Sequence, residues 1–223
     1  MNKKNIRILL INPNTTSSMT DKIGEVARQV AAPDVDIVAR NPKTGPASIQ
    51  GPEDGLAALP GMLEEVAKGR DDGFDAIILA CFDDTGLAEA RRLSGVPTIG
   101  IGEAAFHVAM LLGAKFSVVT TLAISVPVIE ENLRDYGLES AWRKVREGEV
   151  GVLDLEIDGR SARGKVSNEM ACSLREEQPG ALVLGCAGMA DVASQLSQTH
   201  NVPVIDGVAS AVGLASGLVR LGR

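Results

Sequence analysis

Short apolar runs alternate with longer amphipathic segments along this chain of 223 residues. A near-continuous apolar run is typical of a strand buried on both faces of a parallel sheet, whereas apolar residues at helical spacing indicate a helix with one buried face. In the first half, strands are predicted at residues 6–11, 35–39, 76–80 and 96–101, and helices at 19–30, 53–70, 86–93 and 103–112. The alternation predicts an α/β fold with parallel sheets.

The second half follows a similar order of elements. Strands are predicted at 115–119, within 144–155, at 180–185 and around Pro203, helices at 126–136, 164–178 and 209–221, and a turn at 158–161. Between the second strand and its helix, residues 41–52 form a loop rich in Pro and Gly. Loops of this length are commonly functional, so residues 41–52 are a candidate lid.

Two of the predicted strands end on a cysteine, roughly half a chain length apart. Cys81 follows the run Ala-Ile-Ile-Leu-Ala, and Cys186 follows Ala-Leu-Val-Leu-Gly. Each cysteine is followed by small or polar residues, a helix and a Val-Pro strand, at Pro97 in the first copy and Pro203 in the second. The repeat predicts two Rossmann-like lobes with four-stranded parallel sheets, related by a pseudo-twofold axis, with the active site between them. We expect the lobes at residues 1–112 and 113–223, with the last helix able to pack onto the first lobe.

The net charge and the hydropathy of the chain limit the kinds of binding partner and the cellular compartment that we expect. The formal net charge is −7, which argues against nucleic acid or an anionic membrane surface as a partner, because both are bound by clustered Lys and Arg. The sequence shows no secretory signal and no apolar stretch long enough to cross a bilayer. We therefore expect a cytoplasmic protein whose three cysteines stay reduced.

A cysteine between a parallel strand and a helix lies where backbone N–H groups favour an anion, so we expect a lowered thiol pKa there. Two such sulfurs on opposite faces of a substrate carbon form a base and an acid. That pair suits removal of a proton next to a carbonyl and its return to the other face. The enolate needs hydrogen-bond donors. Such donors are expected at the strand ends, from Asn14, Thr120, Thr121 and the backbone of Ala187 and Gly188.

Six short motifs carry a resemblance to a known family. They are Asn12-Pro13-Asn14-Thr15, Ala47 to Gly51, Ala80-Cys81-Phe82-Asp83-Asp84, Gly100 to Ala104, Val118 to Thr121 and Gly185-Cys186-Ala187-Gly188-Met189. In this order they resemble the hydantoin racemase branch of the aspartate/glutamate racemase superfamily. The resemblance implies a racemase without a cofactor or metal that acts on 5-monosubstituted hydantoins through two cysteines. It also implies a homo-oligomer with a small-molecule substrate.

The resemblance assigns roles to residues of this chain. Cys81 and Cys186 would exchange the proton. The groups that hold the imide would be Asn14, Thr120, Thr121 and Gly188, and those near the ring or its substituent would be Ile49, Phe82 and Asp83. Gln50 departs from similar proteins, which often have Glu. No histidine follows Cys186 closely, which favours a neutral ring over an amino acid, and the presence of Cys81 disfavours an arylmalonate decarboxylase.

Three other functions fit the sequence less directly. Allantoin racemisation uses the same chemistry and differs only in the C5 substituent. A lyase or cis-trans isomerase of the superfamily would use one cysteine as a nucleophile toward a dicarboxylate. A ligand-binding α/β module would have structural cysteines.

Several further features are expected to be structural. Cys172 has no counterpart in the repeat. Gly100-x-Gly102-x-x-Ala105 matches a dinucleotide fingerprint in form, but the next strand ends in threonines instead of an acid, so tight packing explains the glycines. His107 is expected to be a satisfied core residue and His200 a solvated one. Neither has a metal-ligand spacing with the cysteines, so no zinc site is predicted.

Overall fold

The two predicted sheets are present, and they have the same strand order. The computed structural model describes residues 5–112, 115–157 and 159–222. The first sheet has the order β2-β1-β3-β4 and the second the order β6-β5-β7-β8, with every described strand pair parallel. The strands are β1 (Ile6–Ile11), β2 (Val35–Arg40), β3 (Ala76–Leu79), β4 (Thr98–Gly100), β5 (Phe116–Thr120), β6 (Trp142–Glu147), β7 (Ala181–Gly185) and β8 (Val204–Ile205). The predicted fold class is confirmed.

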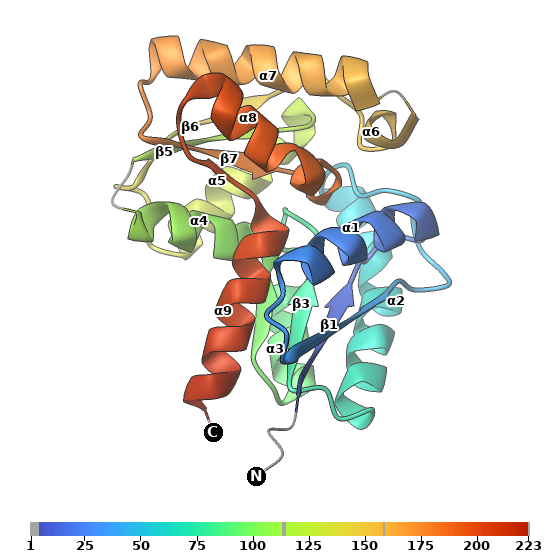
Figure 1. Cartoon of the computed structure of the whole chain (residues 1–223). Coiled ribbons are helices and arrows are strands. Elements are labelled where there is room, and N and C mark those ends of the chain that lie inside the picture. The colour runs from blue at the N-terminus through green and yellow to red at the C-terminus, as the bar shows by residue number, and fades with distance from the viewer. Residues whose placement is uncertain (1–4, 113–114, 158, 223) are drawn as a thin grey trace.

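Helices cover both faces of each sheet (Figure 1). They are α1 (Ser17–Val30), α2 (Pro52–Asp71), α3 (Leu87–Ser94), α4 (Ile101–Leu111), α5 (Val126–Asp135), α6 (Asp154–Ile157), α7 (Gly159–Glu176), α8 (Ala193–His200) and α9 (Gly207–Leu221), with 3₁₀ turns at Ala123–Ser125 and Ala187–Val192. Along β1, Leu9 and Ile11 face the α2 and α3 side, while Ile8 and Leu10 face the α1 and α9 side. Burial on both faces explains the near-continuous apolar runs.

Two helices pack across the expected boundary between the lobes. α4 packs against β7, β8 and α5 of the second half, and α9 packs against α1, β3 and β4 of the first. The Phe106 ring on α4 stacks on Phe116 of β5, with centroids 5.9 Å apart, and meets the edge of Phe82 at 5.3 Å. One hydrophobic core therefore joins both sheets. The division into folding units at residue 112 stays a prediction.

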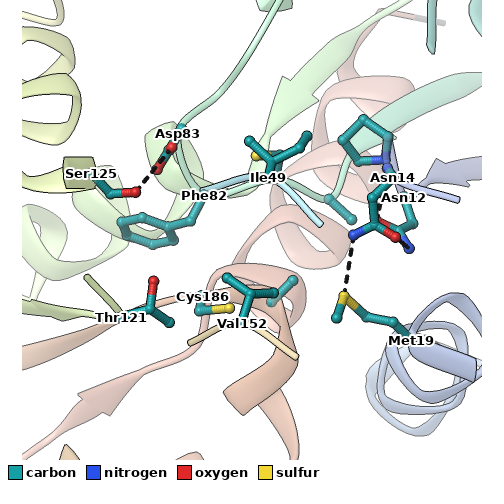
Figure 2. A pocket seen from close by; sticks show the side chains of 14 residues that line it. Asn12, Asn14, Met19, Ile49, Phe82, Asp83, Thr121, Ser125, Val152 and Cys186 are labelled. Carbon is teal, nitrogen blue, oxygen red and sulfur yellow. Dashed lines mark hydrogen bonds between the residues drawn. The ribbon is translucent and has the colours of Figure 1, made fainter. Parts of the chain in front are cut away.

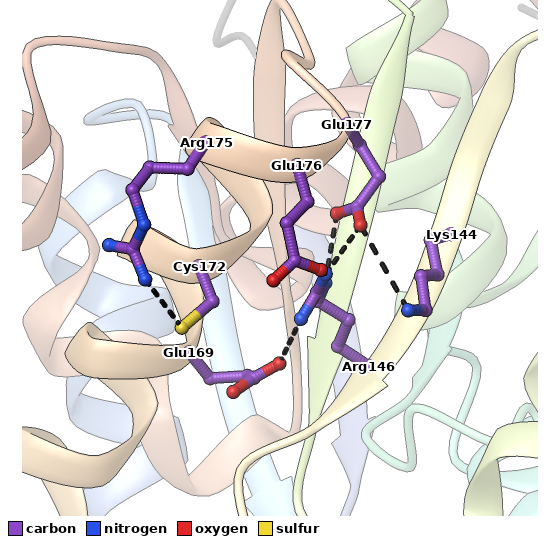
Figure 3. A network of polar contacts seen from close by, with 7 residues as sticks. All are labelled: Lys144, Arg146, Glu169, Cys172, Arg175, Glu176 and Glu177. Atoms are coloured by element: carbon purple, nitrogen blue, oxygen red, sulfur yellow. Dashed lines mark hydrogen bonds and ion pairs between the residues drawn. The ribbon is translucent and has the colours of Figure 1, made fainter.

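A buried arginine fastens α7 to the edge strand β6 (Figure 3). Arg146 is 8% exposed and binds Glu169, Glu176 and Glu177, and this network raises the pKa of Arg146 and lowers that of Glu177. On the same helix, Arg175 Nη2 lies 3.1 Å from Cys172 Sγ. Cys172 is thus part of the outer layer of the second lobe.

The turn predicted at 158–161 is wrong. Gly159, Arg160 and Ser161 begin the long helix α7, and Asp158 lies outside the described residues. Gly159 suggested a turn, but burial of Val166 and Met170 against the second sheet stabilises the helix over this local signal. The short helix α6 was not predicted. Among the described residues, no helix is long and apolar enough to span a membrane.

Candidate active site

A cavity lies between the carboxyl ends of the two sheets (Figure 2), and both predicted catalytic cysteines line it. The full lining is Asn12, Pro13, Asn14, Met19, Ile49, Ala80, Cys81, Phe82, Asp83, Thr121, Ser125, Val152, Cys186 and Ala187. Ligands of open parallel sheets bind at this edge. The predicted residues Asn14, Ile49, Phe82, Asp83, Thr121 and Ala187 are among them.

The two cysteines occupy equivalent positions in the fold. Cys81 follows β3, the neighbour of β1, and Cys186 follows β7, the neighbour of β5. Close approach of β7 to β5 requires glycine at position 185, because a Cβ there would lie 2.7 Å from Thr120 Cα. The repeated strand order therefore brings both sulfurs to one cavity.

Two predicted residues lie outside the lining of the cavity. The Thr120 hydroxyl is buried and donates to Gly185 O at 3.0 Å. The Gly188 carbonyl accepts from Lys22 Nζ at 3.0 Å, which ties the turn after Cys186 to α1.

Six lining residues were not predicted as site residues. They are Asn12, Pro13, Met19, Ala80, Ser125 and Val152. The first two follow β1 directly, so the strand-end rule that selected Asn14 could have found them. Met19, Ser125 and Val152 come from a helix, a 3₁₀ turn and a loop, and they carry no local signal in the sequence.

Asn14 presents a hydrogen-bond donor that is nearly unused. Its side chain is 5% exposed, and its oxygen accepts from Asn12 Nδ2 at 2.9 Å and from the Thr16 backbone N–H at 3.0 Å. Its Nδ2 donates to Met19 Sδ at 3.3 Å (Figure 2). A thioether is a weak acceptor. A substrate carbonyl or enolate oxygen would be a better partner for this N–H group.

The Cys81 thiol lies in surroundings that oppose its ionisation. Burial raises its pKa, and the nearby Asp83 carboxylate raises it further. The Asp83 backbone N–H and the Thr85 hydroxyl, 3.9 Å from the sulfur, act in the opposite direction but more weakly. The expectation of a lowered thiol pKa is therefore wrong for Cys81, because desolvation exceeds the effect of the nearby N–H donor.

The adjacent residues Asp83 and Asp84 have different surroundings. Asp83 faces the cavity, where its Oδ2 accepts from Ser125 Oγ at 3.3 Å, and burial raises its pKa to about 6. The Asp84 carboxylate accepts from the backbone N–H groups of Gly102 at 3.0 Å and Glu103 at 2.7 Å, and from the Tyr136 hydroxyl at 2.9 Å. Burial raises the pKa of Asp84 to about 7.

The glycines of the fingerprint-like motif make room for Asp84. A Cβ at Gly100 would lie 2.0 Å from Asp84 Oδ1, and one at Gly102 would lie 2.4 Å from Phe82 O. The first amides of α4 hold this carboxylate. Tight packing thus accounts for the motif, as predicted.

The loop after β2 contributes Ile49 to the cavity lining. The hydroxyls of Thr15 and Thr16 hold this loop by donating to Pro46 O at 3.2 Å and Ala47 O at 2.7 Å. At its far end, Gln50 Oε1 accepts from the Val152 backbone N–H of the second lobe at 3.1 Å. The neighbouring side chain of Ile49 lines the cavity opposite Val152 (Figure 2).

The histidines lie away from the cavity lining. His107 is half-buried with its Nδ1 2.8 Å from Glu103 O, and His200 is half-buried with its Nε2 2.9 Å from Ser167 Oγ. His200 is therefore less solvated than predicted. Within the described part of the chain, no group of three or more His, Cys, Asp or Glu side chains could hold a metal ion.

Comparison with known proteins places the chain among racemases. The family model "Asp/Glu/Hydantoin racemase" matches residues 8–215. A hydantoin racemase from Rhizobium meliloti is 45% identical over 97% of this chain and 90% of its own. A hydantoin racemase from Pseudomonas sp. (strain NS671) is 40% identical over 98% and 88%. The structure of an allantoin racemase from Klebsiella pneumoniae superposes with a TM-score of 0.95 at 43% identity, covering 98% of this chain and 89% of that one.

Proposed function

Because the chain belongs to the Asp/Glu/hydantoin racemase family and is a racemase, we propose that it interconverts the D and L forms of 5-monosubstituted hydantoins without a cofactor. The observation that carries the proposal is the pair Cys81 and Cys186, which line one cavity from equivalent strand ends of the two lobes. A racemase needs proton carriers on both faces of one carbon, and two equivalent thiols provide them.

The proton exchange at C5 then proceeds through an enolate. One sulfur, as thiolate, removes the C5 proton, and the electron pair moves onto the C4 oxygen. The other sulfur, as thiol, delivers its proton to the opposite face, so that the two cysteines end with exchanged protonation states. Burial and the Asp83 carboxylate raise the pKa of Cys81, which favours Cys81 as the thiol that delivers its proton.

The enolate oxygen needs a hydrogen-bond donor that interacts more weakly with the substrate before the proton is removed. Asn14 Nδ2, whose partner in the free enzyme is the Met19 thioether, is the group proposed for this role. An N–H donor aimed at the position where charge develops stabilises the transition state more than the ground state.

The lining of the cavity favours a neutral ring over a dicarboxylate. No Lys or Arg is among the lining residues, whereas the Asp83 carboxylate is. A dicarboxylate would meet this charge without a cation to balance it. This argues against the lyase or cis-trans isomerase of the superfamily. The two lining thiols at equivalent strand ends argue against a non-catalytic binding module.

Allantoin is the alternative substrate, since it carries a ureido group at C5 of the same ring. Two solved structures described as allantoin racemases, from Klebsiella pneumoniae and Pseudomonas fluorescens, are 43% and 40% identical to this chain. The polar side chains of Asp83, Thr121 and Ser125 at one end of the cavity provide partners for a ureido group.

The deciding experiment follows the C5 proton by NMR in D₂O, together with optical rotation, using single-enantiomer 5-benzylhydantoin and allantoin. A compound that loses both its C5 proton signal and its optical rotation only when the enzyme is present is a substrate. Cys81→Ser and Cys186→Ser are each expected to lower racemisation about 10²- to 10⁴-fold, because each removes one proton carrier. Cys172→Ser is the matched control, since Cys172 lies in the outer layer on α7. Near-normal turnover by either site variant would refute the two-cysteine mechanism.

We also propose that the enzyme works in the cytoplasm as a homo-oligomer. The mechanism needs both thiols reduced, which the cytoplasm favours. A groove between α4 and α9 is lined by Pro97, Leu111 and Leu218, and the last two are 71% and 46% exposed. Exposed apolar surface of this kind is typical of a subunit contact. Sedimentation of the wild-type chain and of Leu111→Glu tests the proposal.

A further inference from the structure

The Asp83 carboxylate lacks the partners that its neighbour has. Asp84 accepts from two backbone N–H groups and a hydroxyl. Asp83 is 9% exposed, yet the described residues provide its carboxylate with a single hydrogen bond, from Ser125 Oγ at 3.3 Å. Its backbone oxygen is held separately by Asn132 Nδ2 at 2.8 Å, so the residue itself is fixed in place. One carboxylate oxygen is therefore left for a ligand.

No cation compensates this charge within the described part of the chain. The lining of the cavity that Asp83 faces contains neither Lys nor Arg. A buried carboxylate with one long hydrogen bond is unfavourable, because water has been removed and little has replaced it. The same charge also opposes ionisation of Cys81. A ligand that donates N–H groups to Asp83 would replace the hydrogen bonds to water that burial has removed.

We infer that Asp83 determines specificity: its carboxylate accepts hydrogen bonds from the N–H groups of an uncharged cyclic amide or urea and repels ligands that carry a carboxylate. This inference deepens the proposed function and rests on it. A hydantoin offers two ring N–H groups, and a 5-ureido substituent adds further ones. These donors share one chemistry, namely an N–H next to a carbonyl, and they differ in whether the ring or the substituent supplies it.

The test compares the wild-type enzyme with Asp83→Asn, which keeps the size of the side chain and removes its charge. Substrates are 5-benzylhydantoin and allantoin, and hydantoin-5-acetate serves as the anionic competitor. Asparagine keeps an acceptor oxygen, so a hydrogen bond to a charged group becomes one to a neutral group, which predicts a fall in kcat/KM of about 5- to 13-fold. An equal fall in kcat/KM for both substrates would mean that the ring N–H groups donate to Asp83. A fall confined to allantoin would mean that the ureido group does. In either case hydantoin-5-acetate should inhibit the variant more strongly than the wild type.

The gain in anion binding separates recognition from damage to the fold, because a distorted site would lose affinity for every ligand. Ser125→Ala is the matched control. It removes the one donor to the carboxylate but keeps the charge, so inhibition by hydantoin-5-acetate should stay weak. If Asp83→Asn does not fold, the wild-type enzyme is tested with 1-methyl and 3-methyl derivatives of 5-benzylhydantoin and with N-methylated allantoins. Methylation of the N–H group that donates a hydrogen bond to Asp83 should lower kcat/KM by a factor similar to that expected for Asp83→Asn.

The inference is overturned if Asp83→Asn retains kcat/KM within twofold on both substrates and binds hydantoin-5-acetate no better than the wild type. If the variant does not fold, equal turnover of all the methylated derivatives overturns it. The proposed function would stand in both cases, because wild-type turnover is measured in the same experiment. If the wild-type enzyme exchanges the C5 proton of none of these hydantoins, the proposed function fails, and this inference fails with it.

Discussion

Replacing Gln50 with leucine should loosen the loop between β2 and α2, which contributes Ile49 to the cavity lining. Gln50 joins this loop to the second lobe through its Oε1, which accepts from the Val152 N–H at 3.1 Å. Its own backbone N–H donates to Asp54 Oδ2 at 3.0 Å, so the side chain leaves from a fixed point at the start of α2. Ile49 and Val152, on the two sides of this bond, line the cavity. Loss of the acceptor should therefore free the wall next to the substrate.

The magnitude follows from the kind of bond that is lost. A neutral, partly buried hydrogen bond contributes about 0.5–1.5 kcal/mol, so opening of the loop should become about 2- to 13-fold more frequent. Because Gln50 touches neither cysteine in the proposed mechanism, KM should rise by this factor and kcat should change less. Hydrogen exchange of the Val152 amide should accelerate by a similar factor, and this measurement needs no substrate.

Glutamate at position 50 is the matched variant, since it keeps the acceptor but adds a charge. The Gly151 N–H donates to Asp154 Oδ2 at 3.1 Å, and both that oxygen and Gln50 Oε1 lie close to Gly151. In Gln50→Glu, repulsion between the new carboxylate and that of Asp154 should therefore weaken the contact with the Val152 N–H. Asp154→Asn in the same chain should remove that repulsion. Unchanged exchange at the Val152 amide in Gln50→Leu would refute the reasoning, and so would equal KM values for the leucine and glutamine forms.

The remaining predictions concern the turn after Cys81. Because burial raises the pKa of native Asp84 to about 7, above its value of about 3.9 in the unfolded chain, the native state binds more protons between these values. The free energy of unfolding should therefore fall as pH rises from 4 to 7, by up to about 4 kcal/mol, and denaturant titrations of Asp84→Asn should show a flatter profile. A profile as steep as that of the wild type would contradict this. Gly102→Ala places a Cβ 2.4 Å from Phe82 O, so it should lower Tm and reduce the free energy of unfolding by about 1–3 kcal/mol. Gly217→Ala is the control, because a Cβ there has nothing within 4 Å and should leave Tm unchanged. Equal Tm values for the two variants would show that the packing at Gly102 is not tight.

The sequence predicted the positions of the two cysteines but not the raised pKa of Cys81. Apolar runs locate the strands, and ligands of parallel sheets bind at the carboxyl ends of the strands. This rule selects Cys81, Cys186 and Asn14, because each follows the carboxyl end of a strand. The pKa of Cys81 depends on the burial of the sulfur and on the nearby charge of Asp83, and both are properties of the assembled cavity. Local pattern cannot report it.

The same limit explains the residues that were missed. Ser125 reaches the cavity from a 3₁₀ turn, and Val152 from an irregular segment before α6. Neither has a periodicity that marks it as part of a site. The helix predicted from residue 164 begins earlier, at Gly159, for a related reason. Its stability comes from packing of Val166 and Met170 on the second sheet, and glycine disfavours a helix only locally.

The two halves of the cavity are alike where the proposed reaction is symmetric and differ where the substrate is not. Racemisation treats both faces of C5 alike, and the equivalent positions after β3 and β7 are both cysteine. The hydantoin ring has no such symmetry, so the groups that recognise it must differ between the halves. Two residues after each cysteine stand Asp83, which faces the cavity, and Gly188, which lies outside its lining. In the proposed mechanism, the duplicated fold therefore supplies two identical proton carriers, while the single carboxylate of Asp83 orients an asymmetric ring between them.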